Sequence, residues 1–215
     1  MLTLVLFDMD GVIFEGSNFW LDLHSAMGTE KQAWQLWEGL GAVNYARLAS
    51  LTANNLWKHK SADKFRELVS TRRPTPHVEQ VFAYLNDAKI KSAIVSSGPY
   101  QLAQKAQRLF GVAEIRANKL DIGEDGRFTG GLDVQVDDNH KDIPAIEVMH
   151  SFGANYETTA MIGDTVSDVS VARLVSLPIA YDTADEALAE ICRHRLSAGN
   201  IAKAVDFLQT KHAEE

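Results

Sequence analysis

Two aspartates separated by one residue, Asp8 and Asp10, follow an apolar run at residues 2–7, and Gly11 comes directly after them. A strand this apolar is normally buried, and a carboxylate at the edge of a protein interior is costly unless a cation, a proton or a hydrogen-bond donor compensates it. A calcium-binding loop also begins with alternating acidic residues, but a third ligand before the glycine and a distal glutamate are missing here. Unless this is an ordinary exposed turn, the pair indicates a reactive or metal-binding strand end.

A second pair of aspartates, Asp164 and Asp168, stands at the end of another β-rich run, residues 158–164, next to Gly163. A glycine lets the backbone approach a neighbouring group closely, and the spacing places both carboxylates on one side of a helical turn. Four carboxylates at one edge would repel one another unless a hard cation lay among them, and oxygen-rich surroundings suit Mg²⁺. The sequence therefore predicts a magnesium site formed by Asp8, Asp10, Asp164 and Asp168.

Ser96 and Ser97 end a third run, residues 92–97, and Pro99 begins the helical stretch that follows. A serine or Gly98 can cap such a helix and leave backbone N–H groups free for a phosphate oxygen, although serine caps without a ligand are common. A phosphate beside a metal needs further positive charge, and Lys141, just before another predicted helix, is placed to supply it. The alternative for Lys141 is a solvated surface lysine.

The elements that must position these residues alternate between short β-rich runs and helical stretches. The runs at residues 2–7, 92–97, 113–118, 158–164 and 177–182 predict strands of a parallel sheet covered by helices on both faces. In an open sheet of this kind, ligands bind beyond the carboxyl ends of the strands, where the motifs would meet. The predicted fold class is α/β, a Rossmann-like parallel sheet.

A long insertion of helical periodicity separates the first two predicted strands. It ends in a proline-rich stretch at residues 71–77, which stops helix and marks a boundary. We expect an α/β core at residues 1–12 and 76–215 and a small helical cap at residues 13–75. The dipeptide Asp125-Gly126 predicts a hairpin within residues 119–134.

All four tryptophans, Trp20, Trp34, Trp37 and Trp57, lie within the predicted cap. Our interpretation is that a small helical subdomain needs these bulky residues for its core. The alternative is that Phe19 or Trp20 faces the active site and favours an apolar or cationic leaving group.

Composition excludes several classes of protein. The 215 residues carry a formal net charge of −8 with scattered lysines and arginines, which disfavours a nucleic-acid partner. The single cysteine, Cys192, permits no intrachain disulfide and favours a reducing cytoplasm. No apolar run approaches the roughly 20 residues that span a bilayer, and no signal peptide is evident, so we expect no membrane partner. The oligomeric state is left open.

The order Asp8-x-Asp10, Ser96, Lys141 and Asp164-x-x-x-Asp168 resembles the haloacid dehalogenase superfamily of phosphohydrolases. The insertion after the first motif and the hairpin before the lysine resemble its phosphoserine phosphatase-like branch. The resemblance implies that Asp8 attacks phosphorus and forms an aspartyl-phosphate, while Asp10 protonates the leaving oxygen and later activates water.

The resemblance also implies how metal and phosphate are held. Mg²⁺ would bind the Asp8 side chain, the Asp10 carbonyl and Asp164, with Asp168 nearby. The phosphoryl oxygens would be bound by Ser96, Lys141 and the N–H groups of Met9, Asp10 and Ser97. The implied substrate is a small-molecule phosphomonoester.

The residues that bind the serine moiety in this branch do not align cleanly here. The glutamate position falls at Ser17, with Glu15 close by, and the arginine position falls near Thr52, with Arg47 the nearest basic residue. We therefore favour a phosphomonoester other than phosphoserine, and take Glu15, Ser17, Trp20 and Arg47 as candidate specificity residues. A phosphotransferase or phosphomutase would use the same central residues, and a non-catalytic binding module is the alternative of another class.

Overall fold

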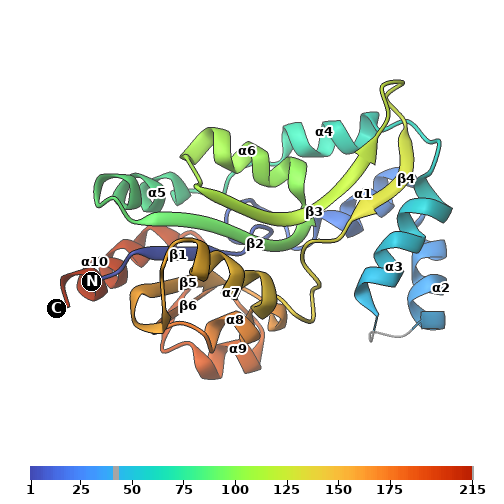
Figure 1. Ribbon diagram of the computed structural model, residues 1–215. Coiled ribbons are helices and arrows are strands. Elements are labelled where there is room, and N and C mark those ends of the chain that lie inside the picture. The colour runs from blue at the N-terminus through green and yellow to red at the C-terminus, as the bar shows by residue number, and fades with distance from the viewer. Residues whose placement is uncertain (41–43, 215) are drawn as a thin grey trace.

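Seven strands form one sheet in the computed structural model, which describes residues 1–40 and 44–214 (Figure 1). The strands are β1 (Leu4–Phe7), β2 (Lys91–Pro99), β3 (Glu114–Ile122), β4 (Phe128–Asp133), β5 (Thr159–Gly163), β6 (Leu177–Tyr181) and β7 (His194–Leu196). Their spatial order is β4-β3-β2-β1-β5-β6-β7, and all neighbours pair in parallel except β3 and β4. The predicted α/β class with a parallel sheet is confirmed.

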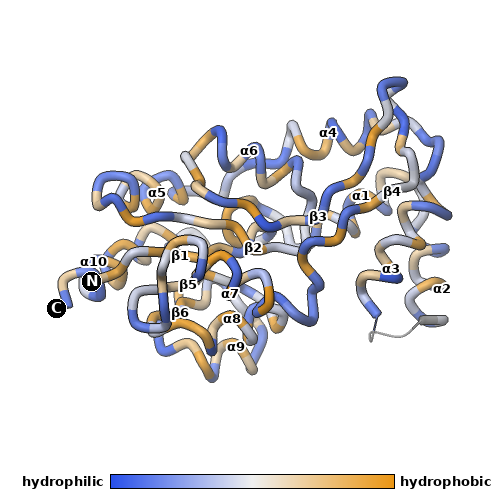
Figure 2. Tube along the Cα trace, viewed as in Figure 1, coloured by the Kyte–Doolittle hydropathy of each residue, from blue (hydrophilic) through white to orange (hydrophobic). Residues whose placement is uncertain are grey.

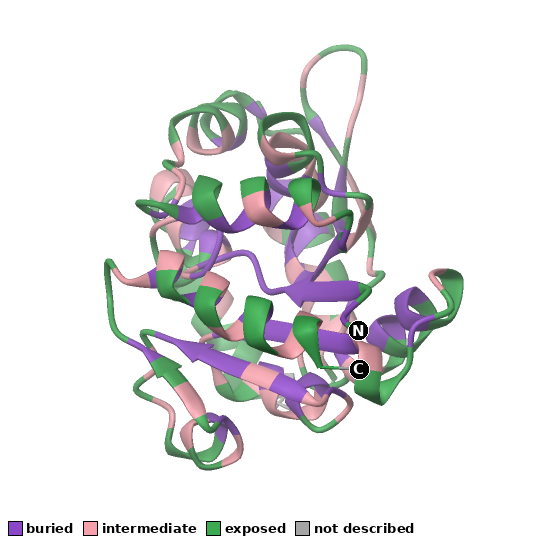
Figure 3. Ribbon diagram, turned by 90° about the vertical axis from the view of Figure 1, so that its left-hand side faces the viewer, coloured by how far each residue is buried: buried purple, intermediate pink, exposed green. Residues whose placement is uncertain are grey.

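The central strand β1 sends its side chains alternately into two cores. Val5 and Phe7 belong to one hydrophobic cluster, whereas Leu4 and Leu6 belong to the other. The first cluster is covered by α5 (Val78–Asp87), α6 (Tyr100–Phe110) and α10 (Ala204–Ala213), the second by α7 (Asp142–Ser151), α8 (Val169–Ala172) and α9 (Glu186–Ile191). Because both faces are buried, the strand is apolar throughout rather than alternating. Figure 3 shows the buried strands between helices whose outer faces are exposed.

Between β1 and β2 the chain forms the predicted helical insertion. It contains α1 (Phe19–Met27), α2 (Glu30–Leu40), α3 (Tyr45–Thr52), a π-helical turn (Ala53–Trp57) and α4 (Asp63–Thr71). The entering and returning segments run side by side, since the N–H of Glu15 donates to the Arg73 carbonyl and that of Thr75 to the Ile13 carbonyl, both at 2.9 Å. The limits of core and cap stay a prediction.

The strand predicted at residues 113–118 and the hairpin predicted at residues 119–134 are one continuous unit. β3 pairs with β2 in its first half and with β4 in its second half. The hairpin contacts the insertion, because Ala62 N–H donates to the Gly126 carbonyl at 3.0 Å and His59 N–H to the Phe128 carbonyl at 2.8 Å. Figure 2 shows that the tip of the hairpin is hydrophilic, in contrast to the central strands. The insertion therefore contacts the hairpin formed by β4 and the second half of β3.

The expectation that the four tryptophans build the cap core is wrong for two of them. Trp57 is buried, but Trp34 and Trp37 are 59% and 42% exposed and stack on each other with ring centroids 4.9 Å apart. They lie on α2, which packs against α1 and α3 and leaves one face open to solvent.

Within the described residues, no helix is both long and apolar enough to cross a membrane.

Candidate active site

The carboxyl ends of two neighbouring strands, β1 and β5, bring three of the predicted acidic side chains together. Phe7 of β1 is level with Ile162 of β5, and the N–H of Asp8 donates to the Ile162 carbonyl at 3.0 Å. Asp8 and Asp164 therefore leave adjacent strands at the same edge of the sheet. Carboxylate oxygens of Asp8, Asp164 and Asp168 all lie within 4.8 Å of one another.

Two glycines are required by the close approach of these carboxylates. A Cβ atom on Gly11 would lie 2.2 Å from Oδ2 of Asp164, and Gly11 has a φ of +78°, in the left-handed region. A Cβ on Gly163 would lie 2.6 Å from the Asp168 carboxylate. Any larger residue at either position would displace an aspartate of the cluster.

Lys141 is buried beside the cluster and is not a solvated surface lysine. Its side chain is 2% exposed, and Nζ donates to Oδ1 of Asp8 and to Oδ1 of Asp168, both at 2.9 Å. Burial lowers the pKa of Lys141, but the carboxylates of Asp168, Asp8 and Asp138 outweigh it, so the net pKa is raised. Lys141 is therefore positively charged and lies between two buried carboxylates.

Asp168 uses both carboxylate oxygens to hold its neighbours. Oδ2 accepts the N–H groups of Asp164 at 3.0 Å and Thr165 at 3.2 Å, while Oδ1 accepts from Lys141 at 2.9 Å. Because these bonds fix the loop that carries Asp164, Asp168 orients the other groups of the cluster.

The cluster fits a hard divalent cation. Oδ1 of Asp164 is buried and has no hydrogen-bond partner in the described part of the chain. Burial, followed by the charges of Asp8 and Asp168, raises the pKa of Asp164 to about 9. A divalent cation would satisfy the unpaired oxygen and remove the repulsion, and carboxylate oxygens are the donors that such cations prefer.

Asp10 directs its side chain away from this cluster, toward the insertion. Oδ2 accepts the Phe19 N–H at 3.0 Å, and Oδ1 lies 3.1 Å from Nη2 of Arg72. Burial raises the pKa of the Asp10 carboxyl, the Phe19 N–H and Arg72 lower it, and the net direction is upward. The two aspartates of the first motif thus occupy different electrostatic surroundings.

Arg72 is a residue that sequence reasoning missed. It directly follows α4 and also lies 2.5 Å from Asp22, with its guanidinium 5.7 Å from the ring centroid of Phe19. Lys105 of α6 fixes this segment by donating to the carbonyls of Ser70 at 2.7 Å and Arg72 at 2.6 Å. The available signal was a basic residue where the chain returns from the insertion toward an acidic motif.

The ends of β2 and β1 offer groups that can bind a phosphoryl oxygen. Ser96 is buried, and its Oγ accepts the Gly98 N–H at 3.2 Å, which leaves the hydroxyl proton free to donate. The N–H groups of Met9 and Asp10 donate to no protein acceptor within residues 1–40 and 44–214.

The expected serine cap of α6 is absent. The strand β2 extends to Pro99, and Pro99 precedes α6 without a side-chain cap bond.

Ser97 connects this strand end to the insertion. Its hydroxyl donates to Oδ1 of Asp138 at 2.8 Å. Its carbonyl accepts from Nε1 of Trp20 at 2.8 Å, Nδ2 of Asn118 at 2.9 Å and the hydroxyl of Tyr45 at 3.2 Å. Two aromatic side chains of the insertion are thereby bonded directly to the candidate phosphate-binding strand.

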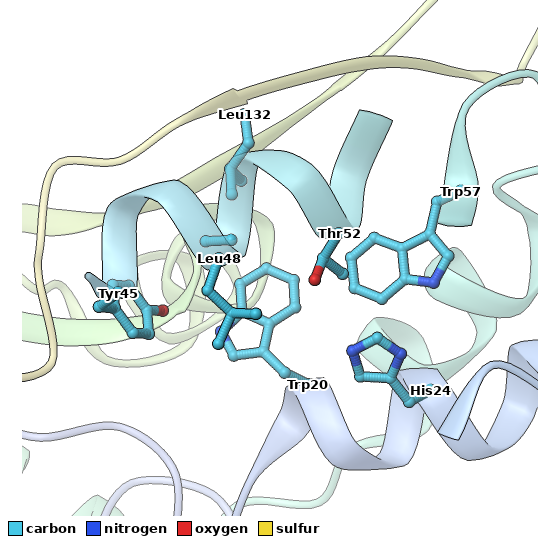
Figure 4. A pocket seen from close by; sticks show the side chains of 8 residues that line it. Trp20, His24, Tyr45, Leu48, Thr52, Trp57 and Leu132 are labelled. Carbon is cyan, nitrogen blue, oxygen red and sulfur yellow. The ribbon is translucent and has the colours of Figure 1, made fainter. Parts of the chain in front are cut away.

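The candidate specificity residues are separated by the structure. Trp20 lines a cavity of about 100 Å³ between α1, α3 and β4 (Figure 4). Glu15 and Ser17 line a wider hollow of about 450 Å³ that also includes Asp164. Glu15 forms an exposed ion pair with Arg73 at 2.9 Å. Arg47 is exposed on α3 and is not part of the lining of either space.

Comparison with known proteins places this geometry in a family. Residues 2–175 match the haloacid dehalogenase-like hydrolases. The phosphoserine phosphatase of Methanocaldococcus jannaschii is 24% identical over 181 residues, which cover 83% of this chain and 84% of that protein. A substrate-bound phosphoserine phosphatase structure superposes with a TM-score of 0.80 at 20% identity, covering 96% of this chain and 98% of that one. An apo phosphoserine phosphatase structure gives a TM-score of 0.81 at 20% identity, with coverage of 96% and 99%.

Proposed function

Since this chain belongs to the haloacid dehalogenase-like hydrolases, we propose that it is a Mg²⁺-dependent phosphatase that hydrolyses small phosphomonoesters through an aspartyl-phosphate on Asp8. The observation that carries the proposal is the buried arrangement of Lys141 between Asp8 and Asp168, each 2.9 Å away, beside Asp164. The similarity to phosphoserine phosphatases supports phosphate esters as the substrate class.

Asp8 is the proposed nucleophile. Its Oδ1 is bound by Lys141 at 2.9 Å, which leaves Oδ2 to attack phosphorus in line and to displace the alcohol. Lys141 offsets the negative charge of the carboxylate and of the phosphoryl group as they approach. Ser96 and the N–H groups of Met9 and Asp10 bind the phosphoryl oxygens.

Asp10 is the proposed proton donor and acceptor. Its raised pKa favours a proton on the carboxyl, which is given to the leaving oxygen when the ester bond breaks. The ionised carboxylate then accepts a proton from the water that hydrolyses the aspartyl-phosphate. Two aspartates can perform opposite tasks because their surroundings differ: Lys141 contacts Asp8 at 2.9 Å, whereas burial raises the pKa of Asp10.

Asp8, Asp164 and the carbonyl of Asp10 are the proposed Mg²⁺ ligands, with Asp168 orienting them. The ion supplies charge that stabilises the phosphoryl oxygens in the transition state. The unpaired Oδ1 of Asp164 supports this assignment. The single, buried Cys192 supports a reducing, cytoplasmic location.

Release of inorganic phosphate from acetyl phosphate and ethyl phosphate in the presence of Mg²⁺ tests the proposal. Asp8→Asn is expected to abolish release while its circular dichroism spectrum stays that of the parent. Retained turnover in this variant would refute the nucleophile assignment.

Product analysis with an added alcohol separates a hydrolase from a phosphotransferase, since only the latter would transfer most of the phosphoryl group to the alcohol.

A further inference from the structure

The cavity beside Trp20 has walls from two helices, a π-helical turn and the hairpin (Figure 4). Its volume is about 100 Å³. A cavity of about 150 Å³ in a protein interior binds benzene, so a ring or a branched alkyl group is the scale of occupant that suits this space. The larger side chains of the lining, which are aromatic or aliphatic, are Trp20, His24, Tyr45, Leu48, Trp57 and Leu132.

Four polar atoms of the aromatic walls are bonded to protein groups. Nε1 of Trp20 and the hydroxyl of Tyr45 both donate to the Ser97 carbonyl, at 2.8 and 3.2 Å. Nε1 of Trp57 donates to Oγ1 of Thr29 at 3.3 Å, and Nδ1 of His24 bonds to the same oxygen at 2.8 Å. These side chains therefore offer the cavity mainly their apolar ring surfaces.

Among the described residues, the lining carries no charged side chain at neutral pH. These residues include no aspartate, glutamate, lysine or arginine. Burial lowers the pKa of His24 to about 4 and raises that of Tyr45 to about 12, so both are neutral. A charged group in this cavity would lose hydration without gaining a counter-charge.

Trp20 is a wall of the cavity and also contacts the strand end that carries the proposed phosphate site. This residue bonds the carbonyl of Ser97 at the end of β2, and the N–H of the preceding residue, Phe19, donates to Oδ2 of Asp10 at 3.0 Å. A phosphomonoester whose phosphorus lies at Asp8 and whose leaving oxygen lies near Asp10 would direct its alcohol toward this part of the insertion.

We propose that this cavity binds an uncharged apolar group, aromatic or branched alkyl, on the alcohol of the phosphomonoester substrate. The inference rests on the proposed phosphatase function and narrows its substrate class. The hydroxyl of Thr52, drawn in Figure 4, is a polar group of the wall that can accept or donate one hydrogen bond to such a substrate. Phosphorylated amino acids, with an ammonium and a carboxylate, do not fit this chemistry.

A panel of alkyl phosphates with similar leaving groups tests the inference. Ethyl phosphate is the small reference, benzyl phosphate and 3,3-dimethylbutyl phosphate carry apolar groups, and phosphocholine is the cationic isostere of the latter. We expect kcat/KM for the two apolar esters to exceed that for ethyl phosphate by at least about tenfold, because even one methylene in an apolar pocket contributes about 10-fold or more. Phosphocholine and phosphoserine are expected not to exceed ethyl phosphate.

Filling the cavity is the second arm of the test. Ala49→Leu places a larger side chain in the lining, and Ala46→Leu makes the same change on α3 outside the lining. The ratio of kcat/KM for benzyl and ethyl phosphate should fall about tenfold in the first variant and stay unchanged in the second. Leu132→Phe fills the cavity from β4 and replaces Ala49→Leu in this test if that variant does not fold.

The outcomes separate the two proposals. A preference for phosphoserine or phosphocholine, or an unchanged ratio in the folded filling variants, overturns the apolar assignment while phosphatase activity stands. If neither ethyl phosphate nor acetyl phosphate is hydrolysed, the proposed function fails and the inference falls with it.

Discussion

The guanidinium of Arg72 lies 3.1 Å from the carboxylate of Asp10, and these two residues are 62 positions apart in the chain. Arg72 stands where the insertion returns to the sheet, and Lys105 of α6 holds its backbone carbonyl at 2.6 Å. The ion pair therefore joins the position of the insertion to the side-chain orientation of the proposed proton donor. We propose that Arg72 acts through Asp10 as a positioning residue.

Replacing Arg72 by methionine should impair proton transfer more than phosphoryl transfer. We expect kcat/KM for ethyl phosphate, which reports expulsion of the alcohol, to fall by about 100-fold, because small misplacements of a catalytic group cost about this much. The loss of kcat/KM for p-nitrophenyl phosphate should be much smaller, since its leaving group needs no proton. Because Arg72 lowers the pKa of Asp10, its removal should also shift the alkaline limb of the kcat/KM profile to higher pH.

Arg73→Met is the matched control for this change, because Arg73 is adjacent and pairs with Glu15 on the surface. Its kinetics should stay close to those of the parent. Equal losses of kcat/KM for ethyl and p-nitrophenyl phosphate in Arg72→Met would contradict a role of Arg72 in proton donation by Asp10.

Removing the metal should abolish turnover and make stability depend on pH. Without a cation, the pKa of Asp164 rises from 3.8 to about 9, so between these values the native state retains a proton that the unfolded chain releases. The free energy of unfolding of the metal-free protein therefore falls as pH rises through this range, and the raised pKa of Asp10 acts in the same direction. Thermal unfolding in EDTA at about pH 5, 7 and 9 measures how steeply stability depends on pH.

Asp164→Asn is the control for the metal experiment. Its thermal midpoint in EDTA should vary less with pH, because the titrating carboxyl is gone. Mg²⁺ should raise the midpoint of the parent most at high pH, where no proton competes for the carboxylate. If activity were full in EDTA, or if the thermal midpoint depended equally on pH in parent and variant, the assignment of Asp164 to the metal site would be wrong.

Replacing Lys141 by methionine leaves Asp8 and Asp168 as unpaired buried carboxylates. Breaking a buried ion pair in this way costs about 3–5 kcal/mol of unfolding free energy, to be measured by urea denaturation in EDTA. Phosphatase activity should be lost, and Mg²⁺ should restore part of the stability but not the activity. The exposed Lys119→Met is the control and should unfold like the parent. A stable and active Lys141→Met variant would show that this lysine is dispensable.

Local patterns in the sequence were sufficient to predict the α/β sheet and the strand ends that carry the acidic motifs. The uninterrupted apolar run at Leu4–Phe7 indicates a strand buried on both faces, and the structure places it at the centre of the sheet. Gly163 indicates close backbone approach, and in the structure the Asp168 carboxylate is the group that approaches it. These features depend on neighbouring residues or on the common edge of parallel strands, so periodicity and motif order reveal them.

Contacts between distant segments were decided only by the tertiary structure. The bond from Lys141 to Asp8 spans 133 positions, that from Trp20 to Ser97 spans 77, and no local pattern encodes either. The exposure of Trp34 and the contact of the β3–β4 hairpin with the insertion likewise depend on how the elements pack, not on their own periodicity. The sequence therefore predicted the candidate acidic residues, Ser96 and Lys141, but not Arg72. Packing decided which residues meet and how an apolar cavity forms beside the proposed phosphate site, because packing depends on the paths of connections that local chemistry does not specify.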